Sequence, residues 1–353
     1  MSDEDSILFE RKGDLAVVTL NRPKALNALD LAMIEKMDPQ LKAWEGDPAV
    51  AAVLIKGAGE KAFCAGGDVR AVWQAGKDGG ELTKTFFYEE YRLNRRIHMF
   101  PKPYVAILDG VTMGGGVGLS VHGDFRIATE KLMFAMPETG IGLFPDVGGT
   151  WFLNKCPGET GLYLALTGAR IGAADAAALG LATHVVPSEK TEALEAALAG
   201  AALDADPHGG VARAVEPFAV HAGEPTLAPH RATIDRCFAY DRLEEIFAAL
   251  EADGSVFAAE TLATLKKKSP ASMKVTLAQL RRGRDMDFDS AMKMEYRLSQ
   301  GCLRPGSDFY EGIRAVLVDK DHAPQWRAAR PEDVSDEEVE AYFAPVAREL
   351  QFD

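Results

Sequence analysis

"KPYVAILDGVTMGGGVGLSVHGDFRIATEKLMFAMPETGIGLFPDVGG", residues 102–149, is the stretch from which the fold and the chemistry of this chain are inferred. Three consecutive glycines, Gly114 to Gly116, lie between two apolar runs, and Gly118 follows shortly after. Glycine is unfavourable inside helices and strands, so the run needs a physical reason. One reason is tight packing of a helix start against strands. The other is a ligand lying so close to the backbone that an N–H group can stabilise a developing oxyanion.

The glycine run does not match the common glycine motifs. It is not GxGxxG, since Leu119 and Val121 occupy the positions where a further glycine is required. No GK[ST] follows it, and "GLSVHG" misses the nucleophile elbow because His122 replaces the last glycine. The sequence therefore indicates neither a nucleotide phosphate loop nor an elbow serine.

A second glycine-rich loop lies upstream. In "KAFCAGGDVR", residues 61–70, Gly66 and Gly67 follow a short apolar segment and precede Asp68. Two such loops, each following a strand, can supply two backbone amides to a single carbonyl oxygen. Together they favour an oxyanion site more than either loop does alone.

Three acidic residues are candidates for the chemistry. Glu138 and Asp146 each follow a proline in a Gly/Pro-rich segment flanked by apolar residues. Carboxylates in apolar surroundings have raised pKa values, which suits them to proton transfer or attack. The alternative is that they cap helices or turns. Glu90 lies next to Glu89 in a predicted helix, so one of the two can face a pocket while the other is solvated.

Apolar strands alternate with helical stretches up to about residue 200, a pattern typical of an α/β fold. Asp30 is the expected N-cap of the helix that follows it. From Arg242 onward nearly every segment has helical spacing. We therefore expect two domains, a catalytic core over residues 1–200 and a helical C-terminal domain over residues 201–353. The expected strands lie within residues 15–23, 49–59, 103–110, 125–129, 132–136 and 183–187.

Composition excludes several classes of function. The net charge of -14 disfavours binding of nucleic acid through a general basic surface. No apolar run approaches the roughly 20 residues of a membrane span, and "MSDEDSILFE" lacks an apolar signal core. "LKKK", residues 265–268, is interpreted as a solvated helix end rather than a phosphate site. We expect an intracellular protein without a signal or transit peptide.

Metal and disulfide chemistry are also disfavoured. The sequence contains no HExxH motif and no Cys/His cluster, so a metal site is not expected. Cys64, Cys156, Cys237 and Cys302 lie far apart and are interpreted as reduced thiols.

Four motifs, taken in order, resemble the landmarks of the crotonase (enoyl-CoA hydratase/isomerase) superfamily. They are "NRPKALNAL" (21–29), "AFCAGGDV" (62–69), "GGGVGL" (114–119) and "FAMPETGIGLFPDVGG" (134–149). The resemblance implies an α/β fold with a crotonase-like ββα spiral core and a helical C-terminal domain. It also implies an acyl-CoA thioester whose carbonyl oxygen lies between the amides of Gly67 and Gly115.

One position departs from the hydratases of this superfamily, which use two glutamates to manage water. The second matches Glu138, whereas the first falls at Gly118, which has no side chain. Further segments, "FFYEEYRLN" (86–94), "MEYRLSQ" (294–300) and "DFYEGIRAVLVDKDHAPQW" (308–326), resemble a thioester-hydrolysing branch. Its reaction is hydrolysis of 3-hydroxyisobutyryl-CoA in valine catabolism.

The resemblance to this branch implies roles for individual residues. Glu138 either attacks the thioester carbon or activates water, and Asp146 and Glu90 bind or orient the hydroxyl end of the substrate. Gly67 and Gly115 stabilise the oxyanion, which makes Glu138, Asp146, Gly67 and Gly115 the expected catalytic residues. The backbone around Ala25 and Ala65 holds the CoA moiety, and Gly66 and Asp68 complete the expected substrate-binding residues.

The expected partner is an acyl-CoA substrate, with no nucleic acid, no membrane and no metal. No cofactor is expected, because coenzyme A enters as part of the substrate. A homo-oligomer formed through the C-terminal helices is a further prediction. The expected location is the bacterial cytoplasm, or the mitochondrial matrix in a eukaryote. Two alternatives remain at this point, a short-chain enoyl-CoA hydratase/isomerase and a non-catalytic acyl-CoA-binding protein.

Overall fold

The computed structural model describes residues 5–203 and 205–352. The chain forms two compact units, each assembled from three segments. The first unit comprises residues 1–67, 92–134 and 171–226, and the second comprises residues 68–91, 135–170 and 227–353. The sequence predicted two domains that follow one another along the chain and meet at residue 200. This domain division stays a prediction.

A six-stranded sheet forms the centre of the first unit, in the order β1-β2-β3-β5-β7-β9. β1 and β2 are antiparallel, and each of the other neighbouring pairs is parallel. Strands such as β2 are apolar on both faces, as expected when a parallel sheet is covered on both sides. The bounds are β1 (Ile7–Lys12), β2 (Leu15–Leu20), β3 (Ala52–Gly57), β5 (Tyr104–Leu108), β7 (Phe125–Ala128) and β9 (His184–Val185).

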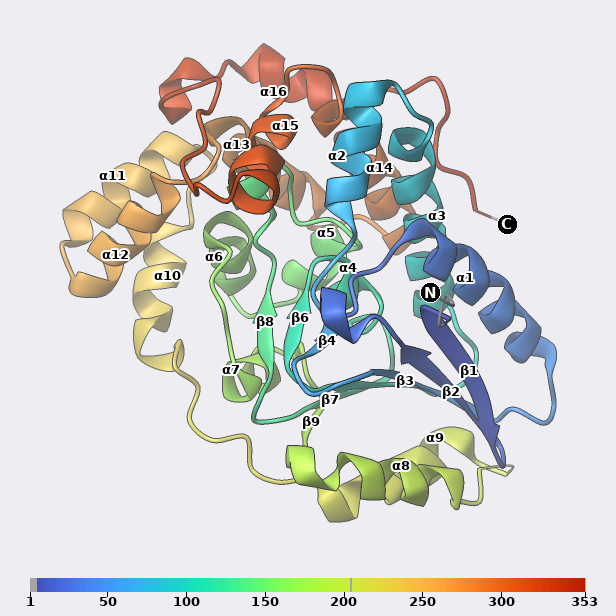
Figure 1. Cartoon of the computed structure of the whole chain (residues 1–353). Coiled ribbons are helices and arrows are strands. Elements are labelled where there is room, and N and C mark those ends of the chain that lie inside the picture. The colour runs from blue at the N-terminus through green and yellow to red at the C-terminus, as the bar shows by residue number, and fades with distance from the viewer. Residues whose placement is uncertain (1–4, 204, 353) are drawn as a thin grey trace. The chain divides into compact units, whose positions relative to one another are not determined.

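Helices α8 (Thr191–Ala199) and α9 (Pro207–Val215) lie along one face of this sheet (Figure 1). Their buried side chains, Leu194, Leu198 and Val211 among them, join the sheet in one hydrophobic cluster. α9 lies beyond residue 200 and nevertheless packs on the sheet. The first unit also contains α1 (Leu31–Gly46) and α7 (Ala173–Ala178). Asp30 caps α1 as predicted, accepting a hydrogen bond from the Met33 amide at 2.9 Å.

A second sheet, in the order β4-β6-β8, positions the glycine loops. Its strands are β4 (Ala62–Cys64), β6 (Val111–Met113) and β8 (Met133–Ala135). β4 runs directly into the Gly66–Gly67 loop, and β6 runs into α4 (Gly115–Gly118). Because β4 and β6 are parallel neighbours, both loops leave the same edge of this sheet.

The second unit is built mainly of helices. α3 (Leu82–His98) belongs to it as far as residue 91. Its candidate carboxylates lie on α3, on the short 3-10 turn η2 (Glu138–Ile141) and in the segment between η2 and α5 (Gly149–Leu153). Its other helices are α2 (Val69–Asp78), α5 (Gly149–Leu153), α6 (Thr160–Thr167), α10 (Arg231–Cys237), α11 (Leu243–Asp253), α12 (Val256–Leu265), α13 (Pro270–Gly283), α14 (Phe288–Cys302), α15 (Asp308–Ile313) and α16 (Asp336–Phe343). The predicted helical character of the chain after Arg242 is confirmed.

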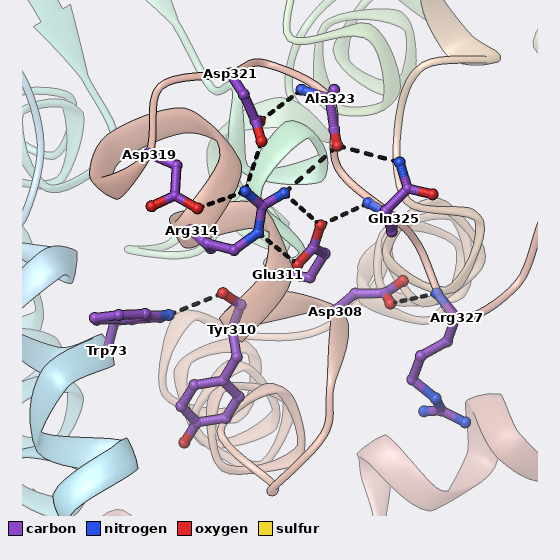
Figure 2. A network of polar contacts seen from close by, with 10 residues as sticks. All are labelled: Trp73, Asp308, Tyr310, Glu311, Arg314, Asp319, Asp321, Ala323, Gln325 and Arg327. Carbon is purple, nitrogen blue, oxygen red and sulfur yellow. Dashed lines mark hydrogen bonds and ion pairs between the residues drawn. The ribbon is translucent and has the colours of Figure 1, made fainter.

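Arg314 holds the segment that follows α15 in place through several hydrogen bonds (Figure 2). Its guanidinium donates to both Glu311 oxygens, at 2.9 and 2.8 Å, and to Asp319 and Asp321 at 2.7 and 2.6 Å. The Glu311 carboxylate also accepts from the Gln325 amide at 2.6 Å. A guanidinium offers several donors in a fixed plane, so one side chain fixes the course of residues 311–325. Within the part of the chain that the structure describes, no helix combines the length and apolarity of a membrane span.

Candidate active site

The second unit brings the three predicted carboxylates, Glu90, Glu138 and Asp146, into one buried cluster. Their exposed fractions are 2%, 4% and 4%. Burial raises the pKa of Glu138 well above its ordinary range, and the nearby charge of Asp146 raises it further. Burial, then the charges of Asp146 and Glu138, raise the pKa of Glu90 in the same way. Since like charges in an apolar setting oppose ionisation, the carboxylates of this cluster do not ionise independently of one another.

Asp146 accepts a hydrogen bond from a neighbouring side chain. The Tyr91 hydroxyl donates to its Oδ2 at 2.9 Å. Burial raises the pKa of Asp146 to about 7, although the bond from Tyr91 acts in the opposite direction. The alternative role of Asp146 as a helix cap is not what the structure shows, since α5 begins after Gly148 without a side-chain cap.

Glu90 and Glu138 present oxygens that nothing in the described part of the chain satisfies. The Oε1 atom of Glu90 and the Oε2 atom of Glu138 are buried without a hydrogen-bond partner. Buried polar atoms are nearly always hydrogen-bonded, so such atoms need an explanation. A substrate hydroxyl or an attacking water would supply the missing partner to either oxygen.

The turn that carries Asp146 is strained and firmly held. Val147 has φ of 52° and Gly148 has φ of 87°. The left-handed region is unfavourable for a β-branched residue such as Val147. Glu295, fully buried on α14, accepts hydrogen bonds from the Gly148 and Thr150 amides, both at 2.8 Å. Gln279 donates from α13 to the Pro145 carbonyl at 2.8 Å.

Glu295 and Gln279 are functional candidates that the sequence did not single out. Glu295 lies within "MEYRLSQ", where an acidic residue occupies a position that is apolar in the helical pattern. The signal would have been a charged residue on the apolar face of a helix, because such a residue must have buried partners.

Replacing Glu295 by alanine should lower the free energy of unfolding by about 2 to 5 kcal/mol, because two buried amides lose their acceptor. Thiol release from the substrate should fall as well, since the Asp146 turn relaxes. Urea denaturation and a thiol assay measure the two effects. Glu251→Ala removes a carboxylate from an exposed position of α11 and serves as the control. Equal urea midpoints for the Glu295 variant and the parent would contradict this role.

The predicted oxyanion loops lie in the first unit, and the structure places them side by side. A Cβ atom added at Gly66 would lie 3.9 Å from the Gly115 amide nitrogen. Gly66 has φ of 114° and Gly114 has φ of 46°, which L side chains rarely adopt. At Gly116 an added Cβ would lie 2.3 Å from the Cys64 carbonyl oxygen. The tight-packing interpretation of the glycine run is confirmed by these contacts, and the oxyanion interpretation stays a prediction.

The residues expected around CoA divide between the units. Ala25 ends the 3-10 turn η1 (Pro23–Ala25), and the Ala65 amide donates to the Leu26 carbonyl at 3.0 Å. The Leu29 amide donates to the Gly66 carbonyl at 2.8 Å, which fixes this loop to the η1 region. Asp68 belongs to the second unit, where it caps α2 by accepting from the Ala71 amide at 3.3 Å.

The site residues thus form two groups. The glycine amides, Ala25 and Ala65 lie in the first unit, and the carboxylates lie in the second. Among the described residues, no group of three or more His, Cys, Asp or Glu side chains is arranged to hold a metal ion. All four cysteines are buried and none takes part in a disulfide.

A family model described as "Enoyl-CoA hydratase/isomerase" matches residues 15–343. This chain belongs to that family. The chicken (Gallus gallus) protein named "3-hydroxyisobutyryl-CoA hydrolase, mitochondrial" is 50% identical over 345 residues, covering 96% of this chain and 89% of that protein.

Two solved structures are similar over nearly the whole chain. One is a carnitinyl-CoA dehydratase from Mycobacterium thermoresistibile, with TM-score 0.92, 43% identity and 99% of each chain covered. The other is an enoyl-CoA hydratase from Rhodobacter sphaeroides, with TM-score 0.90 and 41% identity, covering 99% of this chain and 100% of that one. The predicted crotonase-like fold with a helical C-terminal region is confirmed.

Proposed function

We propose that this protein hydrolyses the thioester of 3-hydroxyisobutyryl-CoA, giving 3-hydroxyisobutyrate and CoA. The 50% identity to a hydrolase of that name over 96% of the chain supports the substrate. The observation that carries the proposal is the buried cluster of Glu90, Glu138 and Asp146, in which two carboxylates present unpaired oxygens. Such a buried cluster suits proton transfer and attack at a carbonyl.

Glu138 is the proposed catalytic carboxylate, and two routes agree with its position. In one, its oxygen bonds to the thioester carbon, the C–S bond breaks, and the CoA thiolate leaves and takes up a proton. Water then cleaves the resulting mixed anhydride. In the other route, Glu138 removes a proton from water and the hydroxide attacks the thioester carbon. The C–S bond then breaks, and the CoA thiolate leaves and takes up the proton. A mass increase on Glu138 in rapidly quenched enzyme would identify the first route.

The backbone amides of Gly67 and Gly115 are the proposed donors to the thioester oxygen. Support comes from the adjacent, side-chain-free loops and from the close packing of Gly116 against Cys64. A fixed amide stabilises the negative charge that develops in the tetrahedral state, and one such donor contributes about 3 kcal/mol. α4 has four residues, so we assign this effect to the amide itself rather than to a helix dipole.

An enoyl-CoA hydratase is the second candidate, favoured by the name of the Rhodobacter sphaeroides structure. Gly118 argues against it, because the first hydratase glutamate would fall at this position. Incubation with crotonyl-CoA and with 3-hydroxyisobutyryl-CoA separates the two. Release of free thiol supports the hydrolase, and faster loss of the enoyl absorbance from crotonyl-CoA would overturn it.

Glu90 or Asp146 is proposed to accept a hydrogen bond from the substrate 3-hydroxyl. A bond to a charged acceptor contributes roughly 1.5–3 kcal/mol, so kcat/KM should favour 3-hydroxyisobutyryl-CoA over isobutyryl-CoA by at least about tenfold. The kcat/KM values of both thioesters are measured with the parent, Glu90→Ala and Asp146→Ala. Loss of the residue that binds the 3-hydroxyl should lower the ratio of the two kcat/KM values. Equal kcat/KM values for both thioesters in the parent would refute hydroxyl recognition.

The remaining assignments are proposals of the same kind. The backbone around Ala25, Ala65 and Gly66, with Asp68, would hold the CoA moiety. CoA enters as part of the substrate, and we propose that no cofactor takes part. The relative from chicken is named mitochondrial. A matrix or bacterial cytoplasmic location, and a homo-oligomer through the C-terminal helices, stay predictions.

A further inference from the structure

Lys268 is the one lysine of "LKKK" that turns away from solvent. Lys266 and Lys267 are exposed, as the sequence predicts for a solvated helix end, whereas Lys268 is half-buried. The backbone next to it is tied to the turn that carries Glu138, because the Ser269 amide donates to the Thr139 carbonyl at 3.1 Å. Lys268 therefore has a fixed place beside η2.

Two glycines make room for the Lys268 ammonium group. A Cβ atom added at Gly140 would lie 3.3 Å from its Nζ, and one added at Gly168 would lie 3.4 Å from it. In the described part of the chain, the Lys268 ammonium makes no hydrogen bond and no ion pair within 4.0 Å. A half-buried cation without a direct partner is costly, so a role in the site would explain its presence.

The charges around Glu138 show what this cation can do. The negative charge of Asp146 opposes ionisation of Glu138, and Glu138 in turn raises the pKa of Glu90. The charge of Lys268 acts in the opposite direction and lowers the pKa of Glu138. Burial, with Arg170 and Lys267, lowers the pKa of Lys268, whereas Glu138 raises it.

The charged residues on the other elements packed against η2 contribute little to the pKa of Glu138. α6 contains no charged residue. On α15, the Asp308 carboxylate accepts from the Ser269 hydroxyl at 2.5 Å and from the Arg327 amide at 3.0 Å, and Glu311 is paired with Arg314 (Figure 2). Lys274 of α13 is paired with Glu244 at 2.6 Å. Among the described residues, Lys268 is the cation whose charge lowers the pKa of Glu138.

We propose that Lys268 is a positioning residue for the hydrolysis, whose ammonium beside η2 favours the ionised form of the Glu138 carboxylate against the opposing negative charge of Asp146. The inference rests on the proposed function, because an ionised Glu138 is what attacks the thioester or accepts the proton of water. A protonated carboxyl does neither.

The test is the pH profile of kcat/KM for thiol release, whose acid limb reports ionisation of the catalytic base in the free enzyme. Removing the cation raises the pKa of Glu138, so less of it is ionised at a given pH. In Lys268→Met the acid limb should move to higher pH by about one unit, which lowers kcat/KM about tenfold at acidic pH. On the alkaline plateau, where Glu138 is ionised in both proteins, the variant should stay within about threefold of the parent.

Three further variants complete the experiment. Lys268→Arg keeps the charge and should restore the parental limb. Lys267→Met removes the exposed neighbouring charge and should leave the limb in place. Lys268→Gln is a second neutral variant, with the same expected shift if the methionine variant fails to fold. A loss of activity of equal size at every pH in both neutral variants, or an unmoved acid limb, would overturn the proposal.

This outcome is separate from failure of the proposed function. If Glu138→Gln remains active, Glu138 is not the catalytic carboxylate and the proposed function is overturned. If that variant is inactive while the neutral Lys268 variants keep the parental acid limb, only the role of Lys268 fails.

Discussion

Replacing Glu138 by glutamine should lower kcat for thiol release from 3-hydroxyisobutyryl-CoA by about a thousandfold. The change keeps the size and shape of the side chain, so folding and acyl-CoA binding should persist. An amide is neither a nucleophile nor a base, and positioned acid–base groups contribute about 10²–10⁴ in rate. Burial together with the charge of Asp146 raises the pKa of Glu138, which ties its reactivity to pH.

The matched control is Glu89→Gln, the same substitution at the neighbouring helix position, which is not fully buried. It should leave kcat within about twofold of the parent, since Glu89 lies outside the carboxylate cluster. Binding of CoA by both variants, followed by calorimetry, separates lost chemistry from lost folding. If Glu138→Gln keeps kcat within about threefold, the loss is only about 0.7 kcal/mol and Glu138 is misassigned.

The parts of the site predicted from the sequence are those with a local signal. Glu138 and Asp146 stand out as acidic residues in an apolar, Gly/Pro-rich segment, and both are buried as expected. Each of the expected strands up to residue 187 is observed, because apolar periodicity and caps such as Asp30 act locally, whereas β1 and β6 were not predicted.

What the sequence could not show depends on residues far apart in the chain. Glu295 becomes informative only when its carboxylate meets the Gly148 and Thr150 amides, 147 and 145 positions away. Lys268 looks like its exposed neighbours in the sequence, and its burial follows from room left by Gly140 and Gly168. α9 has an ordinary helical pattern, and only its packing assigns it to the sheet.

The same reasoning from packing makes Gly116 the most informative glycine to change. An alanine Cβ there would lie 2.3 Å from the Cys64 carbonyl oxygen and 2.8 Å from its Cβ. The first of these atoms is backbone in β4, so α4 must move away from the strand that leads into the Gly66–Gly67 loop. The Gly115 amide moves with α4, and the proposed oxyanion site opens.

Gly116→Ala should therefore lower kcat by about a hundredfold or more, the usual cost of one lost oxyanion donor. KM should change little, because this donor acts mainly in the transition state. Gly46→Ala adds the same methyl group at the end of α1, where nothing lies within 4 Å, and should retain parental kcat. Both variants are compared per folded molecule, with the folded fraction taken from denaturant unfolding. A folded Gly116→Ala enzyme with parental kcat would show that the Gly115 amide does not hold the thioester oxygen.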